Sequence, residues 1–192
     1  MSVAPIAETE PFVRSPESHA FETFWRSLRG ARHVPRRSDF HPGRAKQLIS
    51  DLILVEAPNT RSTFLRIRVT GGHFDELVGC DLTGCDPMDF LPDAYRAGGI
   101  ESTRLVLEFP CGLWQVSPAH LVRGYAVNLE ITMLPLAPDS DGPGFLLCHV
   151  RSFGDPMRAT LPTANGLGLD TALAFEFLDV GAGVPVWIAQ AA

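Results

Sequence analysis

Apolar and polar residues alternate most regularly between Arg123 and Leu134. Every second residue from Tyr125 to Met133 is apolar, and the residues between them are small or polar. A period of two that lasts over such a length is typical of a β-strand with one face against a core. Shorter alternations and compact apolar runs predict four more strands, at residues 52–56, 64–70, 113–117 and 145–151.

The N-terminal region carries the pattern of an amphipathic helix. Ser15 suits the N-cap of this helix, Pro16 its first position and Gly30 its end. An apolar stripe recurs at helical spacing between them and consists of Phe21, Phe24, Trp25 and Leu28. Such a stripe has to pack on its own domain or on a second subunit. We expect a homodimer, with Phe21, Phe24 and Trp25 at or near the interface.

Further helices are predicted between the second and third strands. A longer helical region runs from Pro92 to about Glu108. Gly98 and Gly99 each weaken it by roughly 1 kcal/mol relative to alanine, so we expect a break there. Short helical turns are predicted there at residues 73–78 and 86–91, and another precedes the first strand at residues 41–48.

Two strands, several short helices and three more strands indicate the α+β class. We expect a five-stranded antiparallel sheet with short helices on one face and an N-terminal helix. The chain divides into a flexible tail (1–14), a domain with its N-terminal helix (15–151) and a C-terminal extension (152–192). This extension packs on the domain or is partly disordered. Within it, residues 171–179 could form a sixth strand or a helix.

Composition points to a globular protein, with 45% hydrophobic and 20% charged residues. No stretch approaches the ~18 apolar residues of a membrane span, and the N-terminus lacks the basic start and apolar block of a secretory signal. We therefore expect a cytoplasmic protein without a membrane partner, in which the four cysteines are reduced thiols. An acidic pI of about 5.4 and the lack of a helix-turn-helix pattern disfavour nucleic acid as a partner.

The net charge of −6 is distributed unevenly. Residues 26–46 contain seven basic residues and one acid, Asp39, so this segment carries about +6 and the rest about −12. Arg32, Arg36 and Arg37 could bind phosphate oxygens bidentately, which makes a receptor for an anionic nucleotide one hypothesis. We favour the alternative that Arg32 and Arg37 pair with acids of the same domain and dock the N-terminal helix.

Three short motifs follow one another along the chain. Arg32, Pro35 and Arg37 form an R-x-x-P-x-R loop after a Trp-containing helix, residues 77–84 read LVGCDLTG, and residues 131–136 read ITMLPL. In this order and spacing they resemble the R-x-x-P-x-R loop, the FGrdLTG segment and the lllPL strand end of a family of small stand-alone bacterial PAS proteins. The resemblance covers about residues 19–151 and implies a PAS fold. PAS domains generally bind small molecules between sheet and helices, and dimerise or contact partners through the sheet and N-terminal helix.

The resemblance also suggests ligand-binding residues. Tyr95 and Trp114 fall where a PAS pocket has wall residues, and they could line a cavity or fill the core. His149 could contact a ligand, although we favour a packed core histidine. Haem-binding PAS domains place a histidine on the long helix, and residues 92–108 contain none. Neither cysteine of residues 79–87 matches the flavin signature N-C-R-F-L-Q, so haem and flavin are disfavoured and the cofactor is left unknown.

Catalytic motifs are not recognisable in the sequence. It contains no G-x-S-x-G, P-loop or H-E-x-x-H pattern, and His73, Cys80 and Cys85 lack both zinc-site spacing and a fourth ligand. We expect no catalytic residues and no metal site. The leading hypothesis is a sensory or regulatory PAS module that contacts a signalling protein and could hold a small apolar ligand. A nucleotide receptor and an enzyme with an unrecognised site are the alternatives.

Overall fold

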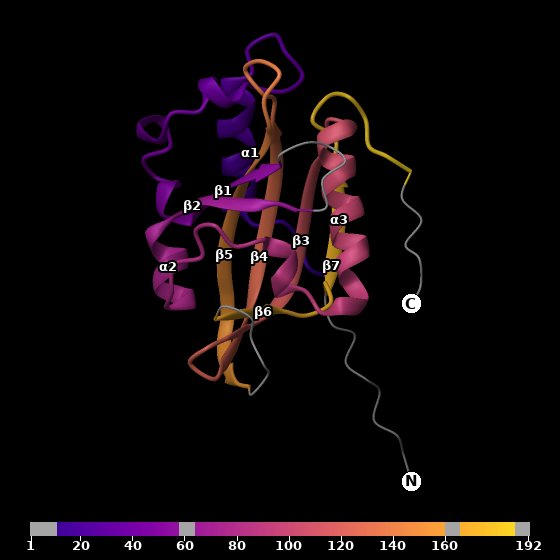
Figure 1. The fold of residues 1–192 in the computed structure, drawn as a ribbon. Coiled ribbons are helices and arrows are strands. Elements are labelled where there is room, and N and C mark those ends of the chain that lie inside the picture. Colours follow the sequence, from indigo (N-terminus) through magenta and orange to yellow (C-terminus); the bar gives the residue numbers. More distant parts are fainter. Residues whose placement is uncertain (1–10, 58–63, 160–165, 187–192) are drawn as a thin grey trace.

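A curled antiparallel sheet forms the middle layer of the protein, and helices cover both of its faces (Figure 1). The computed structural model describes residues 11–57, 64–159 and 166–186. Its strands lie in the order β2-β1-β5-β4-β3-β6, and β7 also pairs with β3. They are β1 (Leu52–Ala57), β2 (Arg66–Thr70), β3 (Gly112–Leu121), β4 (Tyr125–Leu136), β5 (Gly144–Arg158), β6 (Leu167–Leu169) and β7 (Ala174–Leu178).

The helices appear in the order that the sequence predicts. Helix α1 (Pro16–Leu28) precedes the sheet, and α2 (Gly72–Val78) and α3 (Asp93–Glu108) connect β2 to β3. The short 3-10 segments are η1 (Arg37–Asp39), η2 (Pro42–Arg44), η3 (Ile49–Asp51) and η4 (Pro87–Phe90). The predicted α+β class is confirmed. None of the helices in the described ranges is long and apolar enough to cross a membrane.

The C-terminal region extends the sheet beyond the five strands that we expected. β6 and β7 both pair with β3, so residues 171–179 contribute a strand and not a helix. β5 continues to Arg158, past the expected domain boundary after Arg151, and β3 is longer than the predicted 113–117. Residues 152–158, 167–169 and 174–178 of the extension therefore belong to the sheet. The tail expected at residues 1–14 falls mostly outside the described residues.

Helix α1 packs on the outer face of the sheet, opposite α3 (Figure 1). Phe21 and Trp25 are fully buried, and Trp25 Nε1 donates a 2.8 Å hydrogen bond to the carbonyl of Pro135. Phe24 is half-buried and meets the ring of Phe40 edge-on. The protein's own sheet covers Phe21 and Trp25, so the expectation is corrected for direct contact of these two side chains with a second subunit, whereas a position near an interface stays a prediction. The homodimer itself stays a prediction.

Helix α3 runs without interruption through Gly98 and Gly99, which corrects the expected break. A β-carbon on Gly99 would lie 2.6 Å from Leu91 Cδ1 and 3.0 Å from Met88 Sδ, whereas one on Gly98 would meet nothing within 4 Å. Gly99 thus allows α3 to approach η4 closely. The packing that this approach permits offsets the low helix propensity of glycine.

Candidate functional site

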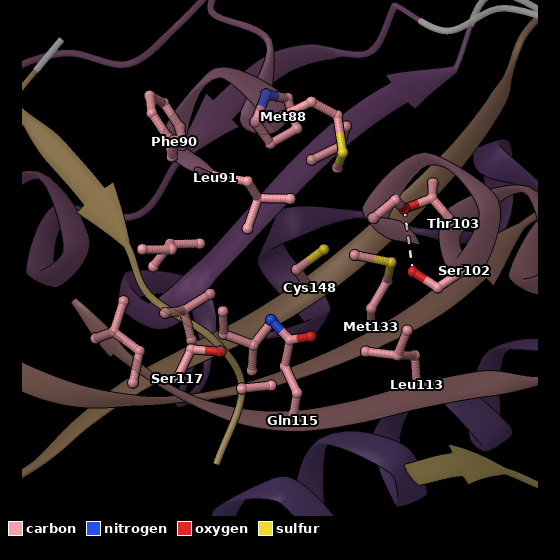
Figure 2. A pocket seen from close by; sticks show the side chains of 18 of the residues that line it. Met88, Phe90, Leu91, Ser102, Thr103, Leu113, Gln115, Ser117, Met133 and Cys148 are labelled. Carbon is pink, nitrogen blue, oxygen red and sulfur yellow. Dashed lines mark hydrogen bonds between the residues drawn. The ribbon is translucent and has the colours of Figure 1, made fainter. Parts of the chain in front are cut away.

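A cavity of about 340 Å³ lies between the inner face of the sheet and the layer formed by α2, η4 and α3. Small-molecule sites have volumes of roughly 300–1,000 Å³ and mostly apolar linings. The walls of this cavity are largely aliphatic and aromatic, as Figure 2 shows. Among the described residues that line it, Asp170 alone is a carboxylate or a strong base. The cavity is therefore a candidate site for an apolar ligand.

Three neighbouring strands form the floor of the cavity. Successive residues of a strand point to opposite faces of a sheet, so every second residue of β3, β4 and β5 faces inward. From the apolar face that the sequence predicts for residues 125–133, Leu129, Ile131 and Met133 belong to this floor. The floor consists of Leu113, Gln115, Ser117, Leu129, Ile131, Met133, Leu146, Cys148 and Val150.

Segment η4 and helix α3 form the roof. The buried carboxylate of Asp86 caps η4 by accepting a 2.9 Å hydrogen bond from the backbone N–H of Met88. Its other oxygen accepts from the backbone N–H of Leu65 at 3.2 Å, which ties η4 to the start of β2. Gly99 then brings α3 against η4, and the Ser102 hydroxyl donates to the Gly99 carbonyl at 3.0 Å. The roof is thus fixed by local polar contacts.

The C-terminal segment closes one side of the cavity. Leu167 and Leu169 of β6, residues 170–172 and Phe175 of β7 line this side. Phe175 is 38% exposed and Tyr95 of α3 is 39% exposed, although both also line the cavity. Residues that face both solvent and cavity mark an opening. We therefore place the mouth between α3 and residues 170–175.

Pro118 accounts for the path of the chain at this mouth. The carbonyl of Pro118 accepts from the Asp170 N–H at 2.9 Å, but the proline nitrogen has no hydrogen to return a bond to the same edge. The chain leaves the sheet after Asp170 and returns where the Leu173 N–H donates to the Val116 carbonyl at 2.8 Å. The residues between β6 and β7 are thereby left to form the rim.

Two polar side chains interrupt the apolar floor. Gln115 projects its carboxamide into the cavity, and the Ser117 hydroxyl lies further along the same strand (Figure 2). Neither side chain forms a hydrogen bond with another described residue. Both groups face the open space of the cavity and have donors or acceptors to offer. These two groups therefore mark where a ligand could offer a hydrogen bond.

The Cys148 thiol also points into the cavity (Figure 2). Burial raises the pKa of Cys148 to about 12, so the thiol is protonated at neutral pH. Since the thiolate is the reactive form, Cys148 acts here as a small apolar wall residue.

The structure separates the three residues that the sequence suggested for ligand binding. Tyr95 lies at the mouth of the cavity. Trp114 and His149 point to the opposite face of the sheet, because each is one residue out of step with an inward-facing neighbour, Gln115 or Cys148. The suggested ligand role is therefore corrected for Trp114 and His149.

Trp114 instead belongs to a polar cluster beneath α1, centred on Glu130. The Glu130 carboxylate is 3% exposed, and one oxygen accepts 2.8 Å hydrogen bonds from Trp114 Nε1 and from the Ser15 N–H. Arg151 lies 3.8 Å from the other oxygen. Burial by itself raises the pKa of Glu130, but the hydrogen bonds from Ser15 and Trp114 and the charge of Arg151 outweigh it. The net pKa is below the usual value.

His149 is a packed core residue on the same outer face. Its ring is 2% exposed and stacks on Phe21 with 5.6 Å between the centroids. Burial lowers the pKa of His149 below the ordinary value, so the ring is neutral at neutral pH. Within the part of the chain that the structure describes, its Nδ1 has no hydrogen-bond partner.

The arginines of the 32–37 loop make several contacts within the domain, although the Arg32 and Arg36 side chains are exposed. Arg32 pairs with Asp39, as we favoured, and the Arg36 N–H donates to Asp39 at 2.7 Å. These contacts, the backbone bond first, hold the pKa of Asp39 below its usual range. Arg37 differs from the expectation: its guanidinium lies over the Phe40 ring, 5.8 Å from the centroid, and donates to a carbonyl. These contacts give the loop a structural role within the domain.

Two other basic residues anchor the C-terminal segment to α1. Arg26 donates to the carbonyl of Asp179 at 2.8 Å, and Arg29 donates to the carbonyl of Val180 at 2.8 Å. Val180 is fully buried beside Trp25 and Leu28 in the core under α1. The chain that forms the rim of the cavity is thus fixed again on the far side of the sheet.

His73, Cys80 and Cys85 do not assemble into a metal centre. His73 hydrogen-bonds to Asp51 at 3.1 Å. Across residues 11–57, 64–159 and 166–186, no group of three or more His, Cys, Asp or Glu side chains could hold a metal ion.

The order β2-β1-β5-β4-β3, with short helices that enclose a cavity over one face, defines the PAS class of sensory and regulatory domains. A family model described as a PAS domain matches residues 13–149, and the chain belongs to this family. The resemblance seen in the sequence is thereby confirmed. A comparison with curated proteins finds no match. β6 and β7, with the rim between them, lie outside the matched residues.

Proposed function

We propose that this protein is a regulatory module, not an enzyme, whose state is set by a small apolar ligand in the cavity. The observation that carries the proposal is the cavity itself, about 340 Å³ of space with mostly apolar walls. A ligand that fills it would remove apolar surface from water, which contributes roughly 25 cal/mol per Å². Membership of a family of generally sensory domains supports this assignment.

Strand β4 offers a direct route from the ligand to the outer face. Ile131 and Met133 face the cavity, whereas Glu130 and Thr132, which alternate with them along β4, contact the start of α1. The Thr132 hydroxyl lies 2.7 Å from that of Ser18 in α1. A ligand that binds two arrangements of β4 with different affinity would therefore also shift the position of α1.

The output that we propose is contact with a signalling protein, made by the domain as a homodimer. The proposal of α1 as the output element is supported by its contacts, because both β4 of the cavity floor and the C-terminal segment contact this helix. Native mass spectrometry of the purified protein, with and without ligand, tests this part. A monomer at all concentrations that retains no partner would contradict it.

Binding of a neutral apolar dye, N-phenyl-1-naphthylamine, tests the ligand site. Wild-type protein and Cys148→Ala, which leaves the cavity open, should bind the dye and increase its fluorescence. Cys148→Phe places a ring in the cavity and should weaken binding by about tenfold or more, equivalent to 1.4 kcal/mol. Met133→Trp fills the same space from β4 and gives an independent check, with circular dichroism to confirm folding. Equal affinity for the dye in the wild type and the three variants would contradict the proposal.

A further inference from the structure

We propose that the ligand is a neutral molecule with an apolar body and one hydrogen-bonding head, and that the Gln115 carboxamide binds this head. The inference rests on the proposed function, because it names the chemical class of ligand for the same cavity. Two observations carry it independently: the position of Gln115 in the floor and the distribution of charge around the cavity.

Gln115 is a polar group surrounded by apolar ones. In the sheet it pairs with Ile131 of β4 on one side and with Phe175 of β7 on the other. Residues paired across strands lie side by side on one face, so all three side chains border the cavity. A carboxamide offers two N–H donors and one carbonyl acceptor, and none of these is used by another described side chain. A head with a donor, an acceptor or both would satisfy it.

The charges around the cavity exclude ionised heads. No Lys, Arg or His is present among the described lining residues, so a carboxylate or phosphate would lose its hydration without gaining a counter-charge. Asp170 lies at the mouth, where its negative charge further disfavours an entering anion. An ammonium head could meet Asp170 only at the exposed rim, far less favourably than a neutral head meets Gln115.

The C-terminal segment helps to form this binding position. Phe175 lies directly beside Gln115 in the register of β3 and β7, and it belongs to the residues outside the family match. Most of the floor, including Gln115 itself, lies within the matched residues, whereas Phe175 at the edge beside the carboxamide lies outside them. We therefore infer that Phe175 of the C-terminal segment contributes to head-group selectivity together with Gln115 of β3.

A series of eight-carbon compounds tests the inference with the full chain near neutral pH. Octanamide, 1-octanol, octanoate and octylamine compete against the neutral dye, with octane as the headless reference. We expect octanamide and 1-octanol to bind about tenfold or more tightly than octanoate and octylamine, a difference of about 1.4 kcal/mol. Gln115→Leu should reduce the affinity for octanamide to that for octane and leave octane binding unchanged.

Asp170→Asn is the matched control at the mouth. It should not restore octanoate binding, since the missing counter-charge lies inside the cavity. If octanoate then binds as well as octanamide, the inference is overturned. The inference is also overturned if the dye binds but all the eight-carbon compounds bind with equal affinity and Gln115→Leu changes none of these affinities. The proposed function would still stand in that case. If neither dye nor any compound binds, the proposed function itself fails.

Discussion

Glu130 shows how a single residue can hold a charge beneath a helix. Both neutral donors, the Ser15 N–H and Trp114 Nε1, bind the same carboxylate oxygen, and Arg151 approaches the other. Ser15 is also the N-cap of α1, so the carboxylate lies at the partially positive end of that helix. The buried charge therefore fixes where α1 begins on the sheet.

Replacing Glu130 by Gln tests this role through pH. Because the folded-state pKa of Glu130 lies below its unfolded value, the ionised form adds stability above about pH 4.5 and loses it as pH falls through the folded pKa. We expect Glu130→Gln to lower the free energy of unfolding by about 1 kcal/mol at neutral pH, since bonds to a charged acceptor are stronger. Urea unfolding measures this difference.

The same difference should shrink as the solution is acidified, because protonated Glu130 is also neutral. Glu176→Gln, at an exposed site on β7, is the control and should match the wild type throughout. A destabilisation of Glu130→Gln that stays constant from neutral to acid pH would show that shape, not charge, explains the loss.

At the scale of elements, two glycines in α3 have different roles. Gly98 is exposed and has free space around its missing side chain, whereas Gly99 faces Leu91 and Met88 at the roof of the cavity. Propensity alone treats the two residues alike, and it therefore led to the expectation of a broken helix. Packing distinguishes them, because only Gly99 is needed for close contact with η4.

Paired alanine substitutions test this distinction. Gly98→Ala should raise the free energy of unfolding by about 0.4–1 kcal/mol, since alanine reduces the entropy of the unfolded chain and favours the helix. Gly99→Ala gains the same helix propensity but pushes on Leu91 and Met88, so we expect it to be less stable than Gly98→Ala. Thermal unfolding of both variants measures the order. Equal stabilisation by the two substitutions would contradict the packing role of Gly99.

The hydrophobic period of the sequence predicts a strand or helix correctly where one face of that element meets the core. The alternation from Tyr125 to Met133 predicts the inward face of β4, of which Leu129, Ile131 and Met133 line the cavity. The fully buried Phe21 and Trp25 lie on the predicted stripe of α1. Period does not say what covers the other face of a strand. Glu130 was therefore assigned to the polar side of its strand, although α1 buries that side.

The candidate site was harder to predict for the same reason. Trp114 and Gln115 are neighbours in sequence but lie on opposite faces, and only the assembled sheet shows which face encloses the cavity. The wall formed by residues 167–175 depends on pairing with β3 across a long sequence separation, which no local pattern indicates. Pro118 in β3 also weakened the strand signal there.

At the scale of the molecule, the C-terminal segment connects both faces of the sheet. Residues 167–175 line the cavity, and the chain then continues to Val180, which is buried beside α1 and held by Arg26 and Arg29. A ligand in the cavity contacts this segment near its start and α3 above it. Binding should therefore order the rim first. The effect should then reach α1 through β4 and the C-terminal segment.

Hydrogen exchange with mass detection tests this order of effects. At saturation with octanamide, about 100 times its Kd, the whole domain should gain about 2.7 kcal/mol of stability. Beyond that general gain, amides of α3 and of residues 166–178 should show the largest local protection, because they form the roof and the mouth. Gln115→Leu with octanamide at the same concentration is the control and should gain clearly less, about 1.4 kcal/mol where its affinity is tenfold lower. Protection confined to α1, with none at the mouth, would mean that the ligand binds outside the cavity.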